Sequence, residues 1–164
     1  VFNEEKNIPV LYERLVNAVT SISNNYEFIF VNDGSKDQSL AVIKSLAANN
    51  SQIKYIDFSK NFGHQPAVFA GLEYATGNSI VIIDADLQDP PELINDLYAK
   101  IQQGYDVVYA QRAHRVGESW HKLLTAKLFY RFINNLSEVP IPLDTGDFRI
   151  ITKKIRDILI IICS

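Results

Sequence analysis

The stretch from Ser79 to Glu92, S-I-V-I-I-D-A-D-L-Q-D-P-P-E, is the part of the sequence on which the fold prediction depends. Its four consecutive apolar residues, Ile80 to Ile83, are typical of a strand buried on both faces, as in a mostly parallel sheet. Pro90 and Pro91 cannot continue a strand, and Pro91 suits the first turn of a helix. The sequence therefore predicts a buried strand, a short acidic loop and a helix.

The acidic loop places three oxygen-bearing side chains two residues apart. In extended backbone Asp84, Asp86 and Gln88 would point to the same side. Mg²⁺ and Mn²⁺ prefer such oxygen ligands, with phosphates and water completing the coordination. The competing interpretation is that the two aspartates only end a strand and cap a helix, but a single cap does not require a second carboxylate and an amide on one face.

The composition indicates an ordinary globular chain. Of its 164 residues, 47% are hydrophobic and 21% are charged, and the net charge of −3 gives no indication of nucleic-acid binding. The single Cys163 excludes an internal disulfide and is compatible with a reducing compartment. The chain has no methionine and opens as if at the end of a strand, so we expect a fragment of a longer protein. The apolar run 158–163 is too short to span a bilayer, which needs about 20 residues.

Helical and extended patterns alternate along the chain. Helices are predicted over 7–22, 37–48, 66–75, from 91 onward and over 120–136, and strands over 27–31, 53–58, 80–83, 106–110 and 144–151. This order is typical of right-handed crossovers, which build a parallel sheet with helices on both faces. We therefore predict an α/β fold in a single domain over residues 1–164.

Polar residues follow four of the predicted strands: Asp33, Asn61 with Gly63, Asp84 with Asp86, and Arg112. In open α/β sheets, ligands bind outside the carboxyl ends of the strands, so these residues are expected to share one crevice. Neither a P-loop nor a dinucleotide fingerprint is present. A metal, rather than a glycine cradle, would then have to bind the diphosphate of a nucleotide.

Five motifs in order resemble the inverting family 2 glycosyltransferases: Phe2-Asn3-Glu4, Val31-Asn32-Asp33-Gly34-Ser35, Lys60-Asn61-Phe62-Gly63, Asp84 to Glu92, and Gly146-Asp147-Phe148-Arg149. More narrowly, they resemble the polyprenyl-phosphate glycosyltransferases, which include dolichol-phosphate mannosyltransferase and bacterial enzymes that glycosylate undecaprenyl phosphate. The resemblance implies a GT-A fold with a Rossmann-like nucleotide-binding half, a UDP- or GDP-sugar donor, and Mg²⁺ or Mn²⁺ at the D-x-D sequence.

The resemblance also implies roles for particular residues. The nucleotide-sugar site would comprise Asn3, Glu4, Asp33, Ser35, Lys60, Asn61 and Asp84, with Glu4 and Asp33 at the base and ribose. The metal would be bound by Asp84, Asp86 and Gln88, and the acceptor phosphate by Arg112 and Arg131. The catalytic group would be Asp86, Asp147 and Arg112, with Asp147 orienting the acceptor, holding Arg149 or serving as a base.

The sequence departs from the family pattern in two ways. The family's first strand is absent, and Asn32 replaces the first of two acids, as in the bacterial branch. Members of that branch carry two transmembrane helices after the catalytic domain, so we expect a cytoplasmic catalytic domain on a membrane-associated protein that could form a homo-oligomer. His64 and His121 are interpreted as surface or packing residues rather than ligands, because no second His or Cys lies at metal spacing.

These features predict an inverting enzyme that transfers a sugar from a nucleotide-sugar to undecaprenyl or dolichyl phosphate, in cell-envelope or glycan biosynthesis. A sugar hydroxyl is the alternative acceptor, and a catalytically silent nucleotide-binding module is the alternative to an enzyme. A nucleotidyltransferase is disfavoured because its glycine-rich, basic signature near the first strand is not visible.

Overall fold

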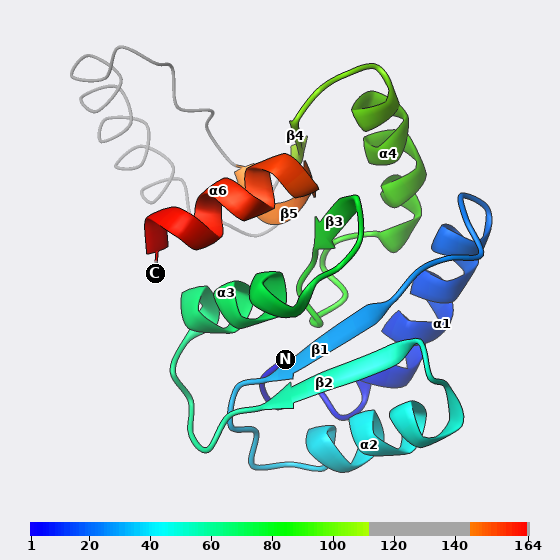
Figure 1. Cartoon of the computed structure of the whole chain (residues 1–164). Coiled ribbons are helices and arrows are strands. Elements are labelled where there is room, and N and C mark those ends of the chain that lie inside the picture. Colours follow the sequence, from blue (N-terminus) through cyan, green and yellow to red (C-terminus); the bar gives the residue numbers. More distant parts are fainter. Residues whose placement is uncertain (112–144, 164) are drawn as a thin grey trace, which may run out of the picture. The chain divides into compact units, whose positions relative to one another are not determined.

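A computed structural model describes residues 1–111 and 145–163 of the chain (Figure 1). Its elements in chain order are α1 (Asn7–Thr20), β1 (Phe28–Asn32), α2 (Ser39–Asn49), β2 (Ile53–Asp57), α3 (His64–Tyr74), β3 (Ser79–Ile82), the 3-10 helix η1 (Pro91–Leu93), α4 (Ile94–Gln102), β4 (Val107–Gln111), β5 (Thr145–Thr152) and α6 (Lys153–Cys163). The predicted alternation of helices and strands is confirmed for these residues. The helix predicted over 120–136 lies outside them.

The chain divides into two compact units, Val1–Tyr109 with Asp147–Ser164, and Ala110–Gly146. All of the contacts described below belong to the first unit. The single catalytic domain over residues 1–164 stays a prediction. Among the described residues, no helix combines the length and the apolar character that a membrane span requires.

Strands β1 and β2 form a parallel pair, with Phe28 opposite Ile53 and Asn32 opposite Asp57. The crossover between them is helix α2, as the alternating pattern predicted. Parallel strands end at the same edge, so the turn after β1 and the loop after β2 become neighbours. This pairing brings two of the sequence motifs together.

Helices cover both faces of this strand pair. Successive residues of a strand point to opposite faces, so neighbouring residues of β1 contact different helices. Phe30 packs with Ile8 of α1 and Ile43 of α2 in a buried cluster. On the other face, Gly71 of α3 lies next to Val31: a Cβ built on Gly71 would be 3.4 Å from a Val31 methyl group. Figure 1 shows α2 and α3 on opposite sides of β1 and β2. The predicted two-sided coverage is confirmed here.

The remaining strands form a second hydrogen-bonded sheet in the order β3-β5-β4. Strand β5 runs antiparallel to β3, with Ile80 opposite Ile151 and Ile82 opposite Arg149. Its apolar residues are the best buried of this sheet, since Phe148 is 0% and Ile150 is 1% exposed. A late segment of the sequence therefore becomes a central strand, which places the 146–149 motif beside the end of β3.

Strand β3 is only half-buried along its whole length, so the prediction that it is buried on both faces is wrong. A groove of about 770 Å³ explains this, because both β1 and β3 line it together with residues of α1, α3 and α4. Val1 pairs with the end of β1: its amino group donates to the Val31 carbonyl at 2.9 Å, and the Asp33 amide donates to the Val1 carbonyl at 2.9 Å. The groove also reaches His64 and Asp84.

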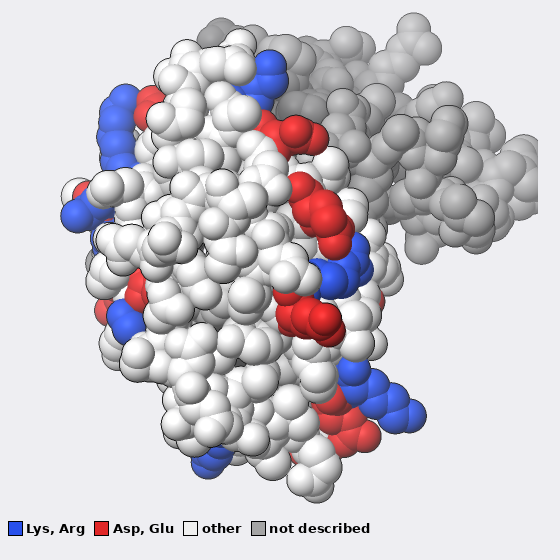
Figure 2. All heavy atoms as spheres, turned by 90° about the vertical axis from the view of Figure 1, so that its right-hand side faces the viewer, with Lys and Arg blue, Asp and Glu red and all other residues white. Residues whose placement is uncertain are grey.

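Charged side chains of both signs alternate on the face of the molecule seen in Figure 2, and most of that face is uncharged. This view agrees with the small net charge of −3. A broad basic surface is the electrostatic footprint of nucleic-acid binding, and this face does not have one among its described residues.

Candidate functional site

The carboxylate of Asp33 holds the loop that follows β2. Asp33 is 4% exposed, and its two oxygens accept hydrogen bonds from the amides of Phe62, at 2.7 Å, and Gly63, at 3.0 Å. These are charge-assisted bonds to backbone donors, which are stronger than neutral hydrogen bonds. The motifs at 31–35 and 60–63 therefore form one structural unit.

Two neighbours of Asp33 strengthen this unit. Gly34 has φ +65°, and a Cβ added there would lie 2.3 Å from the Lys60 carbonyl carbon, so the turn and the loop touch backbone to backbone. Asn32 is 1% exposed, and its amide nitrogen donates to an Asp57 carboxylate oxygen at 2.8 Å. This bond explains why an amide suits position 32, since a second acid there would face Asp57.

Three predicted nucleotide-site residues bind the N-terminal turn to the turn after β1. The Asn3 amide donates to the Ser35 hydroxyl at 3.0 Å, and the Asn3 side-chain oxygen accepts from the Lys36 amide at 2.8 Å. The Glu4 amide donates to the Ser39 hydroxyl at 2.8 Å. A polar pocket of about 310 Å³ lies beside this turn and is lined by Asn3, Glu4, Glu5, Lys6, Asn7 and Asp37.

Lys60 and Asn61, the other two predicted donor-site residues, are exposed on the loop after β2. The Lys60 ammonium lies 5.1 Å from the centre of the Phe62 ring. Arg112 and Arg131, the predicted ligands of the acceptor phosphate, and His121 lie outside the described residues. Their assigned roles stay predictions.

The turn after β3 differs from the extended geometry that the sequence predicted. Strand β3 ends at Ile82, residues 85–86 form a turn, and Leu87 has φ +61°. The Asp86 carboxylate accepts a hydrogen bond from the Gln88 amide at 2.9 Å, a local bond that favours turns over strands. The prediction that Asp84, Asp86 and Gln88 project along one extended face is therefore wrong. The chain must turn here to enter η1 at Pro91.

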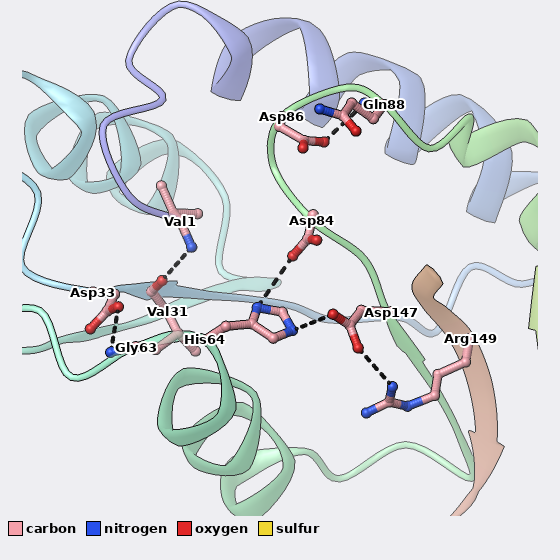
Figure 3. Close-up of polar contacts among 10 residues, drawn as sticks. All are labelled: Val1, Val31, Asp33, Gly63, His64, Asp84, Asp86, Gln88, Asp147 and Arg149. Carbon is pink, nitrogen blue, oxygen red and sulfur yellow. Dashed lines mark hydrogen bonds and ion pairs between the residues drawn. The ribbon is translucent and has the colours of Figure 1, made fainter. Parts of the chain in front are cut away.

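Asp84 instead points toward the first residue of α3 (Figure 3). The Nδ1 atom of His64 lies 3.5 Å from Asp84 Oδ1, and its Nε2 atom lies 3.0 Å from Asp147 Oδ2. All three side chains are about two-fifths exposed, at 39%, 40% and 41% for His64, Asp84 and Asp147. One imidazole thus lies between a carboxylate of the segment after β3 and a carboxylate of β5, in reach of solvent.

Partial burial raises the pKa of the Asp84 carboxyl above its usual value. The positive charge that His64 can carry opposes this rise, and the negative charges of Asp86 and Asp147 add to it. The carboxylate form is thus held in surroundings that disfavour its charge. A cation bound beside Asp84 would remove this penalty.

Asp147 also contacts Arg149, as the sequence suggested, with Arg149 Nη1 donating to Asp147 Oδ1 at 3.3 Å. The Arg149 guanidinium lies 6.0 Å from the centre of the Tyr109 ring. The side chain of Arg149 is 18% exposed, so its charge is held in place at the edge of the site. Strand β5 therefore supplies both an acid and a fixed cation.

His64, Asp84 and Asp147 form a donor set that could hold a divalent cation. One ligand atom from each lies within 4.8 Å of the other two. Ligands on opposite sides of an ion at about 2.1 Å are about 4.2 Å apart, so small side-chain movements close the site. Two oxygens and one imidazole nitrogen form a donor set that accepts first-row divalent metals.

His64 is a surface residue, as the sequence suggested, since its side chain is 39% exposed, and its ring also contacts two acids of the predicted site. No sequence signal for metal spacing marked these contacts, since one partner lies in the turn after β3 and the other on β5. The available signal was the position of His64 directly after the Lys60–Gly63 motif, in the loop that follows a predicted strand. The sheet order, which brings β5 beside β3, was needed to find the contact.

Comparison with known proteins gives a match to the family model "Glycosyl transferase family 2" over residues 1–159. The chain is 50% identical over 157 residues to an uncharacterized glycosyltransferase, YkcC, of Bacillus subtilis, covering 96% of this chain and 49% of that protein. It is 41% identical over 155 residues to a prophage bactoprenol glucosyl transferase homolog of Escherichia coli, covering 94% of this chain and 51% of that protein. The chain thus spans about half the length of these relatives.

Solved structures share the fold at low identity. Glucosyl-3-phosphoglycerate synthase of Mycobacterium tuberculosis, in complex with Mn²⁺, UDP and phosphoglyceric acid, superposes with a TM-score of 0.65 at 19% identity, covering 94% of this chain and 54% of the other. The mannosyltransferase PcManGT of Pyrobaculum calidifontis, with GDP-Man and Mn²⁺, gives 0.60 at 18% identity, covering 97% and 44%. The GT-A fold predicted from the motifs is confirmed. The chain belongs to glycosyl transferase family 2.

Proposed function

We propose that this chain is the catalytic part of an inverting glycosyltransferase that moves a sugar from a nucleotide-diphosphate sugar to a polyprenyl phosphate. The observation that carries the proposal is the convergence of Asp84, Asp147 and His64 at the end of β3. Relatives named bactoprenol glucosyl transferases, about 40% identical over most of this chain, support the acceptor class and a role in the cell envelope.

A divalent ion, Mg²⁺ or Mn²⁺, supplies Lewis-acid stabilisation of the departing nucleoside diphosphate when it is bound. Asp84 belongs both to the ligand set predicted from the D-x-D sequence and to the cluster that it forms with His64 and Asp147. Asp33 contributes indirectly, because it holds the backbone of the loop that carries Lys60 and Asn61 toward the predicted donor site. The donor base, uridine or guanosine, is left open.

The acceptor determines what the remaining residues must do. A lipid phosphate is already an anion, so it attacks without the proton removal that a sugar hydroxyl requires. With a phosphate acceptor, Asp147 does not have to remove a proton. Its contacts with His64 and Arg149 agree with a role other than that of a base. Fixed cations are needed instead, and Arg112 and Arg131 are the proposed ones, since guanidinium groups bind phosphate oxygens in pairs.

Membrane association follows from the same proposal, because a polyprenyl chain partitions into a bilayer and the site has to reach its phosphate. Association through a segment outside this chain, and assembly into a homo-oligomer, are both part of the expectation that rests on the family resemblance.

The test is sugar transfer by the purified chain in detergent micelles, with radiolabelled UDP- and GDP-sugars and Mn²⁺. The matched acceptors are polyprenyl phosphate and polyprenol, which differ only in the phosphate. We expect a labelled lipid with polyprenyl phosphate, none with polyprenol, and none from Asp84→Asn. Equal transfer to polyprenol and polyprenyl phosphate, or to a sugar hydroxyl alone, would contradict the proposed acceptor.

A further inference from the structure

We propose that the groove lined by β1 and β3 is a binding site for one added β-strand, supplied by an extended apolar peptide. The peptide pairs in parallel with β1, and its carboxyl terminus lies next to the amino group of Val1. The groove has a volume of about 770 Å³, and its lining residues belong to the first of the two compact units. This inference goes beyond the proposed function and does not depend on it.

Both strands that line the groove are edge strands within residues 1–111 and 145–163. Strand β1 lies next to β2 in a two-stranded sheet, and β3 is an outer strand of the sheet in the order β3-β5-β4. An edge strand presents a row of backbone N–H and C=O groups that another chain can pair with. Addition of a strand to such an edge is a common way of binding an extended peptide. The groove therefore offers backbone partners as well as space.

Val1 already occupies one position of the added strand. Its amino group donates to the Val31 carbonyl at 2.9 Å (Figure 3), and its carbonyl accepts from the Asp33 amide at 2.9 Å. Bonds from one residue to the two residues that flank its neighbour on the next strand are the pattern of a parallel ladder. Val1 therefore sets the direction and the register of a peptide that lies ahead of it in the groove.

The next backbone groups of β1 are turned to the same edge. On the β2 side, the Phe28 amide donates to the Gln52 carbonyl. Backbone groups of successive strand residues alternate between the two edges, so those of Ile29 and Val31 are on the side of the groove. A peptide in the register of Val1 has the Val31 amide and both backbone groups of Ile29 as hydrogen-bond partners.

The groove requires apolar side chains on both faces of the bound strand. Helix α1 lines it with Leu11 and Leu15, and α3 lines it with Val68 and Leu72. These helices cover opposite faces of β1, and a strand buried on both faces is a continuous run of apolar residues. Since β1 has five residues, a peptide of matching length fits, and burial of the half-buried strand β3 favours its binding.

The amino group of Val1 favours a peptide with a free carboxyl terminus. Burial lowers the pKa of this amine below its ordinary value of 8.0, and the negative charges of Asp84, Asp33 and Glu4 oppose the shift. The amine is thus a positive charge in poorly solvated surroundings. In a parallel strand that ends just ahead of Val1, the terminal carboxylate lies beside the amine and favours its charged form.

The experiment is calorimetric titration of the purified chain with a peptide of alternating isoleucine and valine residues that matches β1 in length. Lysines ahead of these residues keep the peptide soluble. One control peptide ends in an amide instead of a carboxylate, and it should bind at least about tenfold more weakly because it lacks the charge-assisted contact with Val1. The other control has proline at the second and fourth apolar positions, which removes the donors to β1, and it should not bind.

Substitutions in the chain locate the bound peptide. Val68→Arg places a long charged side chain in the groove from α3 and should weaken binding at least about tenfold. The matched control is Val10→Arg, at an α1 position that is 47% exposed and outside the groove lining. This control should stay within about threefold of the parent, since surface substitutions have small effects. Circular dichroism of both variants establishes that they are folded.

Hydrogen exchange of the isotope-labelled chain tests the backbone pairing itself. Bound peptide should slow exchange of the Ile29 and Val31 amides by at least about tenfold, because both become donors in the new ladder. The Phe28 amide, which already donates to the Gln52 carbonyl, should change less.

Absence of binding, equal affinity for the amide peptide, or unchanged exchange at Ile29 and Val31 would overturn the proposal. A parent that elutes as a dimer and becomes monomeric on addition of the peptide would also overturn it, since a second copy of the chain would then be the occupant of the groove.

Discussion

Strands β1 and β3 are each followed by an aspartate of the predicted site, and the two carboxylates lie in different surroundings. Asp33 is 4% exposed, and both of its oxygens accept backbone amides. The side chain of Asp84 is 40% exposed, lies 3.5 Å from the His64 ring, and is held where burial and neighbouring acids raise its pKa.

This difference indicates a structural role for Asp33 and a binding or catalytic role for Asp84. Both oxygens of the Asp33 carboxylate, directly after β1, accept hydrogen bonds from the loop after β2, so removal of this carboxylate should harm the fold. The Asp84 carboxylate, after β3, lies in surroundings that raise its pKa, which is typical of residues that serve binding or catalysis. Four substitutions test this contrast, ordered by their expected effect on the free energy of unfolding.

Asp33→Ala should have the largest effect. It leaves the Phe62 and Gly63 amides without their acceptor, and each hydrogen bond to a charged group is worth about 1.5–3 kcal/mol, so we expect a loss of about 3 kcal/mol or more. Urea unfolding at pH 7 measures it. Asp33→Asn keeps one acceptor oxygen and should lose about half as much. A loss below about 0.5 kcal/mol in the free energy of unfolding of Asp33→Ala would contradict a structural role for Asp33.

Asn32→Asp should cost about 2 kcal/mol, because it replaces a buried donor with a carboxylate facing Asp57. The double variant Asn32→Asp with Asp57→Asn reverses the pair and should recover most of the stability. Urea unfolding of the single and double variants gives the coupling energy. No recovery in the double variant would show that the contact with Asp57 is not the reason for an amide at position 32.

Glu92→Gln tests what anchors the region after β3. Glu92 binds Arg14 of α1 through two contacts at 2.8 and 2.7 Å, and this pair lowers the pKa of Glu92 to about 2. Because the pair is largely exposed, we expect a loss of only about 0.5 kcal/mol at pH 7.

The pH dependence of this pair has a definite sign. A lowered pKa in the folded protein stabilises it above the unfolded value of 4.5, and the contribution disappears as the pH falls through about 2. The difference between parent and Glu92→Gln, measured by urea unfolding, should therefore shrink as the pH is lowered from 4.5 toward 2. A difference that stays constant over this range would exclude the ion pair as its origin.

Asp84→Asn should change the stability least, by less than about 0.5 kcal/mol at pH 7, while abolishing metal binding. The raised pKa means that ionisation of Asp84 costs more in the folded protein, so this carboxylate lowers the stability as the pH rises above its ordinary value of 3.8. The neutral amide avoids that cost. Urea unfolding without metal measures the change in the free energy of unfolding. A loss as large as that of Asp33→Ala would contradict the proposed difference between Asp33 and Asp84.

Several features of the fold followed from local patterns. Within residues 1–111 and 145–163, the helices and strands lie close to their predicted ranges, because apolar periodicity and the Pro90-Pro91 pair act within a few residues. Small shifts occur where a turn dominates: α3 begins at His64 rather than Pro66, and α1 ends at Thr20. The burial of β3 was predicted wrongly, because burial depends on what lies beside a strand.

The sequence by itself determined the family, through five motifs in order, and the residues that belong to the carboxyl ends of the strands. Only the tertiary structure decided how those residues are used. Asp33 became a loop anchor because β2 ends beside β1, and His64 joined Asp84 and Asp147 because β5 pairs with β3. The physical reason is that motif spacing describes neighbours along the chain, whereas hydrogen bonds and metal ligands depend on distances across the sheet.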